Sequence, residues 1–161
     1  PGADLQLRGP LGHGFNLPGT ARRVALAGFD GSCARVLALL EPALALRAGV
    51  VLLTDQPPDG LPAALEILPL AALFETAPWA DYLAVELRRE SLPEFVDLLL
   101  PNRKDSYAQG KTISTSGRVQ VLVDTPVPCG GLAECGACSV SLRPNAQPLL
   151  ACKDGPVFDL Y

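Results

Sequence analysis

Four of the five cysteines in this chain lie in one stretch near its end, residues 128–152. They are Cys129, Cys135, Cys138 and Cys152, with the spacing C-x5-C-x2-C-x13-C. Thiolates are the soft ligands that iron–sulfur clusters and zinc select. Three of them within ten residues, and a fourth on a returning segment, are typical of a loop that wraps a cluster of metal and sulfide.

Three glycines, Gly130, Gly131 and Gly136, lie between these cysteines. Glycine adopts positive φ without strain, and with no side chain in the way its backbone N–H can point at a sulfur atom. We therefore predict that the three glycines line the cluster-binding loop.

The spacing leaves three interpretations of the cysteines. A [2Fe–2S] cluster takes a tight three-cysteine loop with a distant fourth, close to the plant-type C-x4-C-x2-C…C pattern. A structural zinc ribbon usually has two separated C-x2-C knuckles, and only one is present here. Disulfides require a secreted chain, and nothing in the sequence resembles a signal peptide. The spacing favours the iron–sulfur cluster, with zinc as the alternative.

This stretch also resembles a known family. Residues 129–138, followed by the CKDGPVF that begins at Cys152, look like the C-terminal cluster domain of the dihydroorotate dehydrogenase electron-transfer subunit, a ferredoxin reductase-like iron–sulfur flavoprotein. The family usually has four residues between its first two cysteines, and this chain has five. Residues 9–18 (GPLGHGFNLP) resemble the family's linker from the flavin-binding barrel to the nucleotide domain. The resemblance implies that FAD is bound only if such a barrel lies upstream or in a partner.

The part of the chain after residue 20 has an α/β pattern. Short apolar runs predict strands, and helical periodicity predicts helices between them. The expected strands are residues 24–27, 50–53, 65–68 and 82–87, and the expected helices are residues 34–46, 70–76 and 91–100. Strands that alternate with helices at this spacing imply a Rossmann-like, doubly wound parallel sheet.

The turn after the first strand, residues 28–33 (GFDGSC), is where such a sheet would bind a dinucleotide. It has two glycines, and Phe29 and Asp30 occupy positions where the backbone must approach phosphate. Relatives carry a glycine-rich turn here and a Cys-Gly-Pro motif after a late strand, where this chain has Glu86 between Val85 and Leu87. We therefore expect a degenerate nucleotide-binding domain that has lost NAD binding, with Cys33 as a small buried residue rather than a ligand.

The predicted division has three parts. Residues 1–19 are a linker or barrel remnant, residues 20–104 are the degenerate Rossmann-like domain, and residues 105–161 are a small β-rich [2Fe–2S] domain. A polar segment, residues 101–117, is the expected linker between the two domains. Beyond it, residues 118–124 and 139–142 read as strands of a small antiparallel sheet that carries the cysteine loop.

Composition narrows the possible functions of the 161 residues. A net charge of −4 with no run of Lys or Arg argues against a nucleic acid or an anionic membrane as partner. No apolar run reaches the roughly 20 residues of a membrane helix. Reduced cysteines without an export signal point to the cytoplasm.

His13 is the only histidine, so a histidine-assisted nucleophile is not expected, and we predict no catalytic residue. The chain has no methionine, so we expect it to be processed or cut from a longer protein.

These observations predict an electron-transfer component of an oxidoreductase rather than an independent catalyst. The family resemblance implies a cluster that relays electrons between flavins, with a flavoprotein catalytic subunit as partner, during oxidation of dihydroorotate to orotate in pyrimidine biosynthesis. Because the chain offers no second redox site, both ends of the electron path must come from other polypeptides, and we expect an oligomer. The alternatives are a non-redox interaction domain with structural zinc on the same four cysteines, and the C-terminal part of an NADH-dependent flavin reductase.

Overall fold

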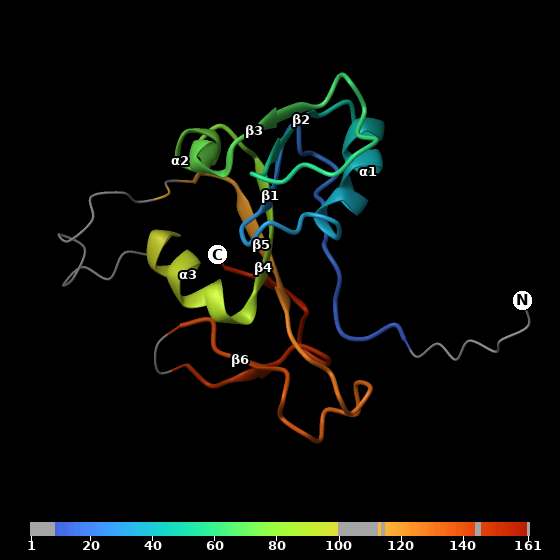
Figure 1. Ribbon diagram of the computed structural model, residues 1–161, viewed down its shortest axis with the longest axis vertical. Coiled ribbons are helices and arrows are strands. Elements are labelled where there is room, and N and C mark those ends of the chain that lie inside the picture. The colour runs from blue at the N-terminus through green and yellow to red at the C-terminus, as the bar shows by residue number, and fades with distance from the viewer. Residues whose placement is uncertain (1–8, 100–112, 114, 144–145, 161) are drawn as a thin grey trace, which may run out of the picture.

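A computed structural model describes residues 9–99, 113, 115–143 and 146–160. Its main feature is a six-stranded, mostly parallel sheet with the strand order β3-β2-β1-β4-β5-β8, in which only β8 runs antiparallel to its neighbour (Figure 1). Its strands are β1 (Arg23–Gly28), β2 (Gly49–Leu53), β3 (Glu66–Leu68), β4 (Tyr82–Arg88), β5 (Arg118–Asp124) and β8 (Val157–Asp159). A second sheet pairs β6 (Ser139–Val140) with β7 (Leu149–Leu150) in antiparallel fashion.

Helices cover both faces of the large sheet, as expected for a doubly wound fold. The helical elements are η1 (Val36–Leu39), α1 (Leu40–Ala45), η2 (Leu70–Ala72), α2 (Leu73–Thr76), η3 (Arg89–Ser91) and α3 (Leu92–Leu99). Figure 1 shows α1 on one side of the strands and α2 and α3 on the other. Alternate residues of β1 follow this division, because Ala25 and Ala27 pack in the core with α2 and α3 whereas Val24 and Leu26 pack in the core with η1 and α1. No helix in the described part of the chain is long and apolar enough to cross a membrane.

The first four strands lie where the apolar runs predict them, to within one residue at most ends. The helical segments lie where they were predicted, with the second matching residues 70–76, but each begins with a 3-10 turn, so its regular α-helical part is shorter than predicted. In the first of them, expected over residues 34–46, regular α-helix starts only at Leu40, which puts Pro42 in its first turn. A proline has no N–H to donate and is tolerated there, so the break comes before Pro42 rather than at it.

The strand over residues 118–124 is not where we predicted it. The sequence interpretation placed it in a small antiparallel sheet, but β5 is the fifth parallel strand of the large sheet and pairs along its whole length with β4. Val119, Val121 and Val123 face the core beneath α3. On the opposite face Gln120 is buried, because its side-chain oxygen accepts hydrogen bonds from the Tyr82 hydroxyl (2.6 Å) and the Asn16 N–H (2.8 Å). Within the described residues the small antiparallel sheet consists of β6 and β7 alone.

The segment around His13 packs against the end of the chain. The His13 N–H donates to the carbonyl of Gly155, and the His13 carbonyl accepts the N–H of Val157 at 3.2 Å. Nearby, a Cβ built on Gly131 would overlap the side chain of Leu11. This N-terminal segment therefore lies against both the strand β8 region and the cysteine loop.

Candidate metal centre

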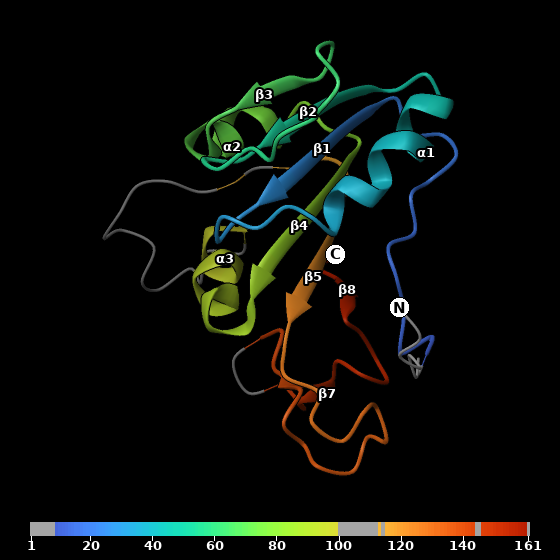
Figure 2. The ribbon, with the colours of Figure 1, turned by 45° about the vertical axis from the view of Figure 1, so that its right-hand side comes forward.

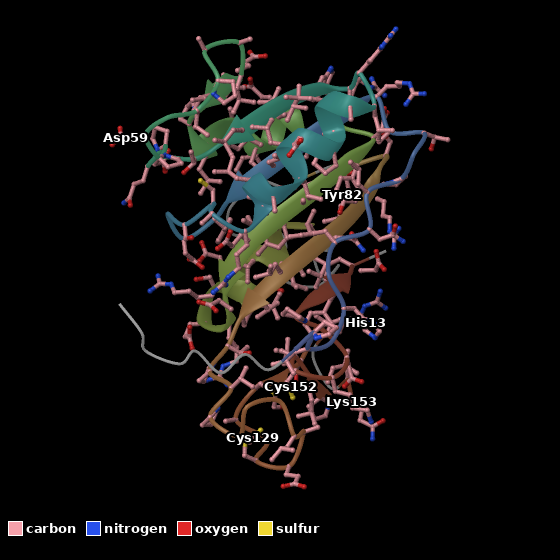
Figure 3. All side chains as sticks on the ribbon, turned by 90° about the vertical axis from the view of Figure 1, so that its right-hand side faces the viewer. His13, Asp59, Tyr82, Cys129, Cys152 and Lys153 are labelled. Carbon is pink, nitrogen blue, oxygen red and sulfur yellow. The ribbon has the colours of Figure 1, made fainter. Side chains whose placement is uncertain are left out.

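The cysteine loop begins where β5 ends and lies beyond the carboxyl ends of the parallel strands. Figure 2 shows it below the arrowheads of β4 and β5, and Figure 3 shows Cys129 and Cys152 at the same end of the molecule. In doubly wound sheets, ligands bind outside this edge of the sheet. The cysteines are thus placed at the edge of the fold that usually carries function.

The loop turns sharply at four residues whose φ angles are positive. Three are the predicted glycines, Gly130, Gly131 and Gly136 (φ 61, 85 and 68°), and the fourth is Ala133 (φ 60°). The left-handed conformation of Ala133 could not be anticipated, since alanine rarely adopts it. These turns reverse the chain repeatedly over a short distance, so several backbone N–H groups face inwards.

The thiols of Cys129 and Cys135 form one pair. A hydrogen bond between them is the main reason that the pKa of Cys129 is lowered to about 6. Desolvation acts in the opposite direction, and the backbone N–H groups of Gly131, Leu132 and Cys135 reinforce the lowering by hydrogen bonding to the Cys129 sulfur. The loop thus stabilises a thiolate at Cys129, which is the form that binds a metal.

Cys138 and Cys152 form the second pair, with their sulfur atoms 3.3 Å apart and both side chains buried. The pKa of Cys152 is raised, first by its hydrogen bond with Cys138 and then by burial and the charge of Cys138. The N–H of Ala133 opposes this shift by hydrogen bonding to Cys152, and the charge of Cys129 adds to it. The charge of Cys129 on Cys152 is the one electrostatic link between the two pairs among the causes of these shifts.

The fold therefore places the four cysteines that the spacing selects in two pairs of thiols, Cys129 with Cys135 and Cys138 with Cys152. Across the part of the chain that the structure describes, no three or more His, Cys, Asp or Glu side chains are grouped so that they could hold a metal ion. A [2Fe–2S] cluster makes a different demand, because each of its two irons takes two protein ligands. Two thiol pairs, with N–H groups directed at sulfur, fit that donor set.

The predicted glycines differ in what they do. Gly131 directs its N–H at the Cys129 sulfur, whereas the N–H of Gly130 donates to the carbonyl of Val127 at 3.0 Å, and the carbonyl of Gly136 accepts from Ser139 at 3.1 Å. Sequence reasoning missed the N–H donors of Leu132 and Ala133. No signal in the side chains could have revealed them, because the groups belong to the backbone.

Cys33 lies apart from the other cysteines, in the core beneath η1 and α1. Burial raises the pKa of its thiol, as does the charge of Glu86, while a hydrogen bond with Thr54 lowers it. The prediction that Cys33 is a small buried residue is confirmed.

The turn between β1 and η1, where a dinucleotide-binding fold holds pyrophosphate, is filled by Glu86 from the end of β4. Glu86 is 4% exposed, and its carboxylate accepts hydrogen bonds from the Ser32 hydroxyl (2.9 Å) and from the N–H groups of Arg35 (2.7 Å) and Val36 (3.3 Å). The N–H groups that would otherwise be available to a phosphate thus already bind a carboxylate of the protein.

The residues that we expected to obstruct this turn point elsewhere. Asp30 accepts the N–H of Arg88 and the hydroxyl of Ser91 (2.6 Å), and so holds the beginning of η3. Phe29 packs edge-on against Phe95, with 5.3 Å between the ring centroids. The group that occupies the turn is the carboxylate of Glu86, a residue that sequence reasoning had noted only as a departure from a motif.

Neither the models of protein families nor the curated proteins with which the chain was compared match it. The family resemblance of the cysteine motif therefore remains a prediction, and a function can be proposed only from the geometry of the site.

Proposed function

We propose that this protein is an electron-transfer component that carries a [2Fe–2S] cluster on Cys129, Cys135, Cys138 and Cys152. The observation that supports it best is the arrangement of the thiols in two pairs, Cys129 with Cys135 and Cys138 with Cys152. In this proposal each pair binds one iron. When bound, such a cluster takes up and releases one electron at a time.

The chain's own residues would hold and tune this centre. The N–H groups of Gly131, Leu132 and Ala133 hydrogen-bond to the sulfur atoms of Cys129 or Cys152. Such hydrogen bonds stabilise negative charge on sulfur, so they favour the reduced state over the oxidised one. A single zinc ion would instead need all four sulfurs around one point.

The two pairs differ in access to solvent, which suggests a direction for electron exchange. Cys138 and Cys152 are buried, whereas Cys135 is exposed and the neighbouring Leu132 is 50% exposed. In this part of the loop the side chains are mostly small, so a partner's cofactor could approach closely. We propose that electrons enter or leave on the side of the Cys129–Cys135 pair, by contact with a flavoprotein subunit such as the dihydroorotate dehydrogenase-like partner that the resemblance implies.

The Rossmann-like part would serve as a scaffold and not as a nucleotide site. The main support is Glu86, whose carboxylate occupies the N–H groups of Arg35 and Val36. A phosphate brought to this turn would meet a fixed negative charge. We therefore propose that NADH does not donate electrons directly to this chain.

Metal and sulfide analysis of freshly purified protein, together with its visible spectrum, tests the proposal. We expect two irons and two sulfides per chain and a reddish-brown colour. Replacing Cys138 with serine should remove or strongly alter the visible absorption, whereas the matched control Cys33→Ser should leave it unchanged. Zinc without sulfide in the wild-type protein would establish the structural-zinc alternative, and micromolar binding of NADH would favour the flavin reductase.

A further inference from the structure

One side chain outside the cysteine loop reaches into it from the large sheet. Arg89 begins η3, directly after β4, and its Nη1 donates a hydrogen bond of 2.7 Å to the carbonyl oxygen of Ala137. Ala137 lies between Cys135 and Cys138, next to the latter in sequence. The bond therefore joins the end of β4 to the part of the loop that supplies two of the four thiols.

The charge of this guanidinium is only weakly compensated by its own neighbours. Among the described residues its one ion pair is with Glu90, at 3.7 Å, and the Glu90 side chain is 71% exposed. An exposed pair at this distance contributes little. The Arg89 side chain itself is 38% exposed, so solvent screens part of its charge without removing it.

We propose that Arg89 is a positioning residue for the cysteine loop, and that its charge raises the reduction potential of the centre held there. This inference rests on the proposed function. One electron, delivered by a reduced flavin of the partner, would add one negative charge beside Cys138. A fixed positive charge on the neighbouring carbonyl stabilises that added charge, and the hydrogen bond keeps the loop in the conformation that directs its N–H groups at sulfur.

The adjacent arginine provides a matched control. Arg88 lies on the same turn, but its side chain is 66% exposed and is placed 3.8 Å from Asp30 instead of reaching the loop. Arg88→Gln and Arg89→Gln remove the same charge from neighbouring positions. Only the second removes a hydrogen bond to the loop.

The test compares Arg89→Gln, Arg89→Lys and Arg88→Gln in the full chain with the wild type. Midpoint potentials are measured by optical titration, and the rate of iron release to a chelator is measured separately. We expect the potential of Arg89→Gln to be more negative than those of the wild type and Arg88→Gln. Iron release from Arg89→Gln should be about tenfold faster, the factor that corresponds to losing one partly exposed charge-assisted hydrogen bond. Lysine keeps the charge and loses the planar fork, so its potential should lie closer to that of the wild type.

A second measurement uses the iron-free chain and does not depend on the cluster. Alkylation of the buried Cys138 by iodoacetamide, followed by mass spectrometry, should be about tenfold faster in Arg89→Gln than in Arg88→Gln, because the loop is released from the sheet. Thermal unfolding of the same samples establishes that each variant folds.

The outcomes separate this inference from the proposed function. If the wild type holds no iron and sulfide, the proposed function fails and the effect on potential fails with it, while the alkylation rates still decide whether Arg89 positions the loop. Equal potentials and equal alkylation rates in the two glutamine variants would overturn the inference while leaving the proposed function intact.

Discussion

The stability of the first turn of the Rossmann-like sheet should depend on Glu86. One of its carboxylate oxygens accepts a hydrogen bond from the Ser32 hydroxyl, and the other accepts hydrogen bonds from the N–H groups of Arg35 and Val36. Glu86→Ala removes all three hydrogen bonds, and it leaves the N–H of Val36 buried without a partner. A buried donor that loses its partner costs about 1 to 3 kcal/mol, and the vacated volume adds to this. We expect Glu86→Ala to lower the free energy of unfolding by about 4 kcal/mol.

Two further variants, Glu86→Gln and Glu75→Ala, separate the effect of the Glu86 charge from that of removing any glutamate. Glu86→Gln keeps an oxygen that can accept the two N–H groups but removes the charge that strengthens those bonds. We expect it to lower the free energy of unfolding by about 1.5 kcal/mol. Glu75→Ala is the control, because Glu75 is exposed on α2 and its removal should cost no more than about 0.5 kcal/mol.

Urea unfolding of the iron-free protein at pH 7, followed by circular dichroism, gives these values by linear extrapolation. The order of stability should be wild type, Glu75→Ala, Glu86→Gln and Glu86→Ala. If Glu86→Ala unfolds at the same urea concentration as Glu75→Ala, the carboxylate does not hold this turn. The proposal that Glu86 occupies the N–H groups needed by a phosphate would then lose its support.

The remaining predictions concern the cysteine loop and one surface ion pair. Gly131→Ala should reduce bound iron and lower the melting temperature, because φ at this position is 85° and a Cβ would overlap the Leu11 side chain. Adding Leu11→Ala should restore part of the loss. If nothing is restored, backbone strain alone is responsible. The pKa of Asp81 is lowered, mainly by its hydrogen bond with Arg23. The ionised carboxylate therefore stabilises the fold fully at pH values above its unfolded pKa of about 4. This stabilisation disappears as the pH falls through the lower pKa of the folded state. Asp81→Asn should therefore unfold more easily than the wild type at pH 7, with a difference that shrinks below about pH 4 in acid-unfolding curves, and a constant difference would contradict this. Leu132→Asp should leave the visible spectrum unchanged while slowing reduction by the cognate flavoprotein in stopped-flow experiments, whereas unchanged rates would mean that electrons enter elsewhere.

Strands β1, β2 and β4 could be predicted from the sequence because each buries side chains on both faces of the sheet. Such strands appear as short apolar runs, and residues 24–27 and 50–53 are examples. The place of β5 could not be predicted in this way. Its alternation of valines with Arg118 and Gln120 is typical of a strand with one solvent-exposed face. In the structure that face is covered, and Gln120 is buried because Tyr82 and Asn16, distant in sequence, satisfy its amide oxygen.

The turn between β1 and η1 shows the same limit of prediction from sequence. The missing glycines in residues 28–33 predict that a phosphate would not be accommodated, and that expectation follows from backbone chemistry alone. Which group occupies the turn depends on β4 lying beside β1, a pairing that brings Glu86 next to Gly28 across 58 residues of sequence. Sequence reasoning assigned the obstruction to Phe29 and Asp30, which lie nearby in the chain but point away from the turn.

In the cysteine loop, too, some features follow from the sequence and others only from the tertiary structure. Residue types and spacing by themselves predict which four thiols form a ligand set and which class of metal that set would suit, because ligand chemistry belongs to side chains and the loop is short. The tertiary structure decided how those thiols pair, which of them are buried, and which N–H groups face them. It also brought Arg89 to the carbonyl of Ala137, from 48 residues away. Backbone direction and contacts between distant segments depend on the whole fold, so the pattern of residues within one stretch of sequence does not contain them.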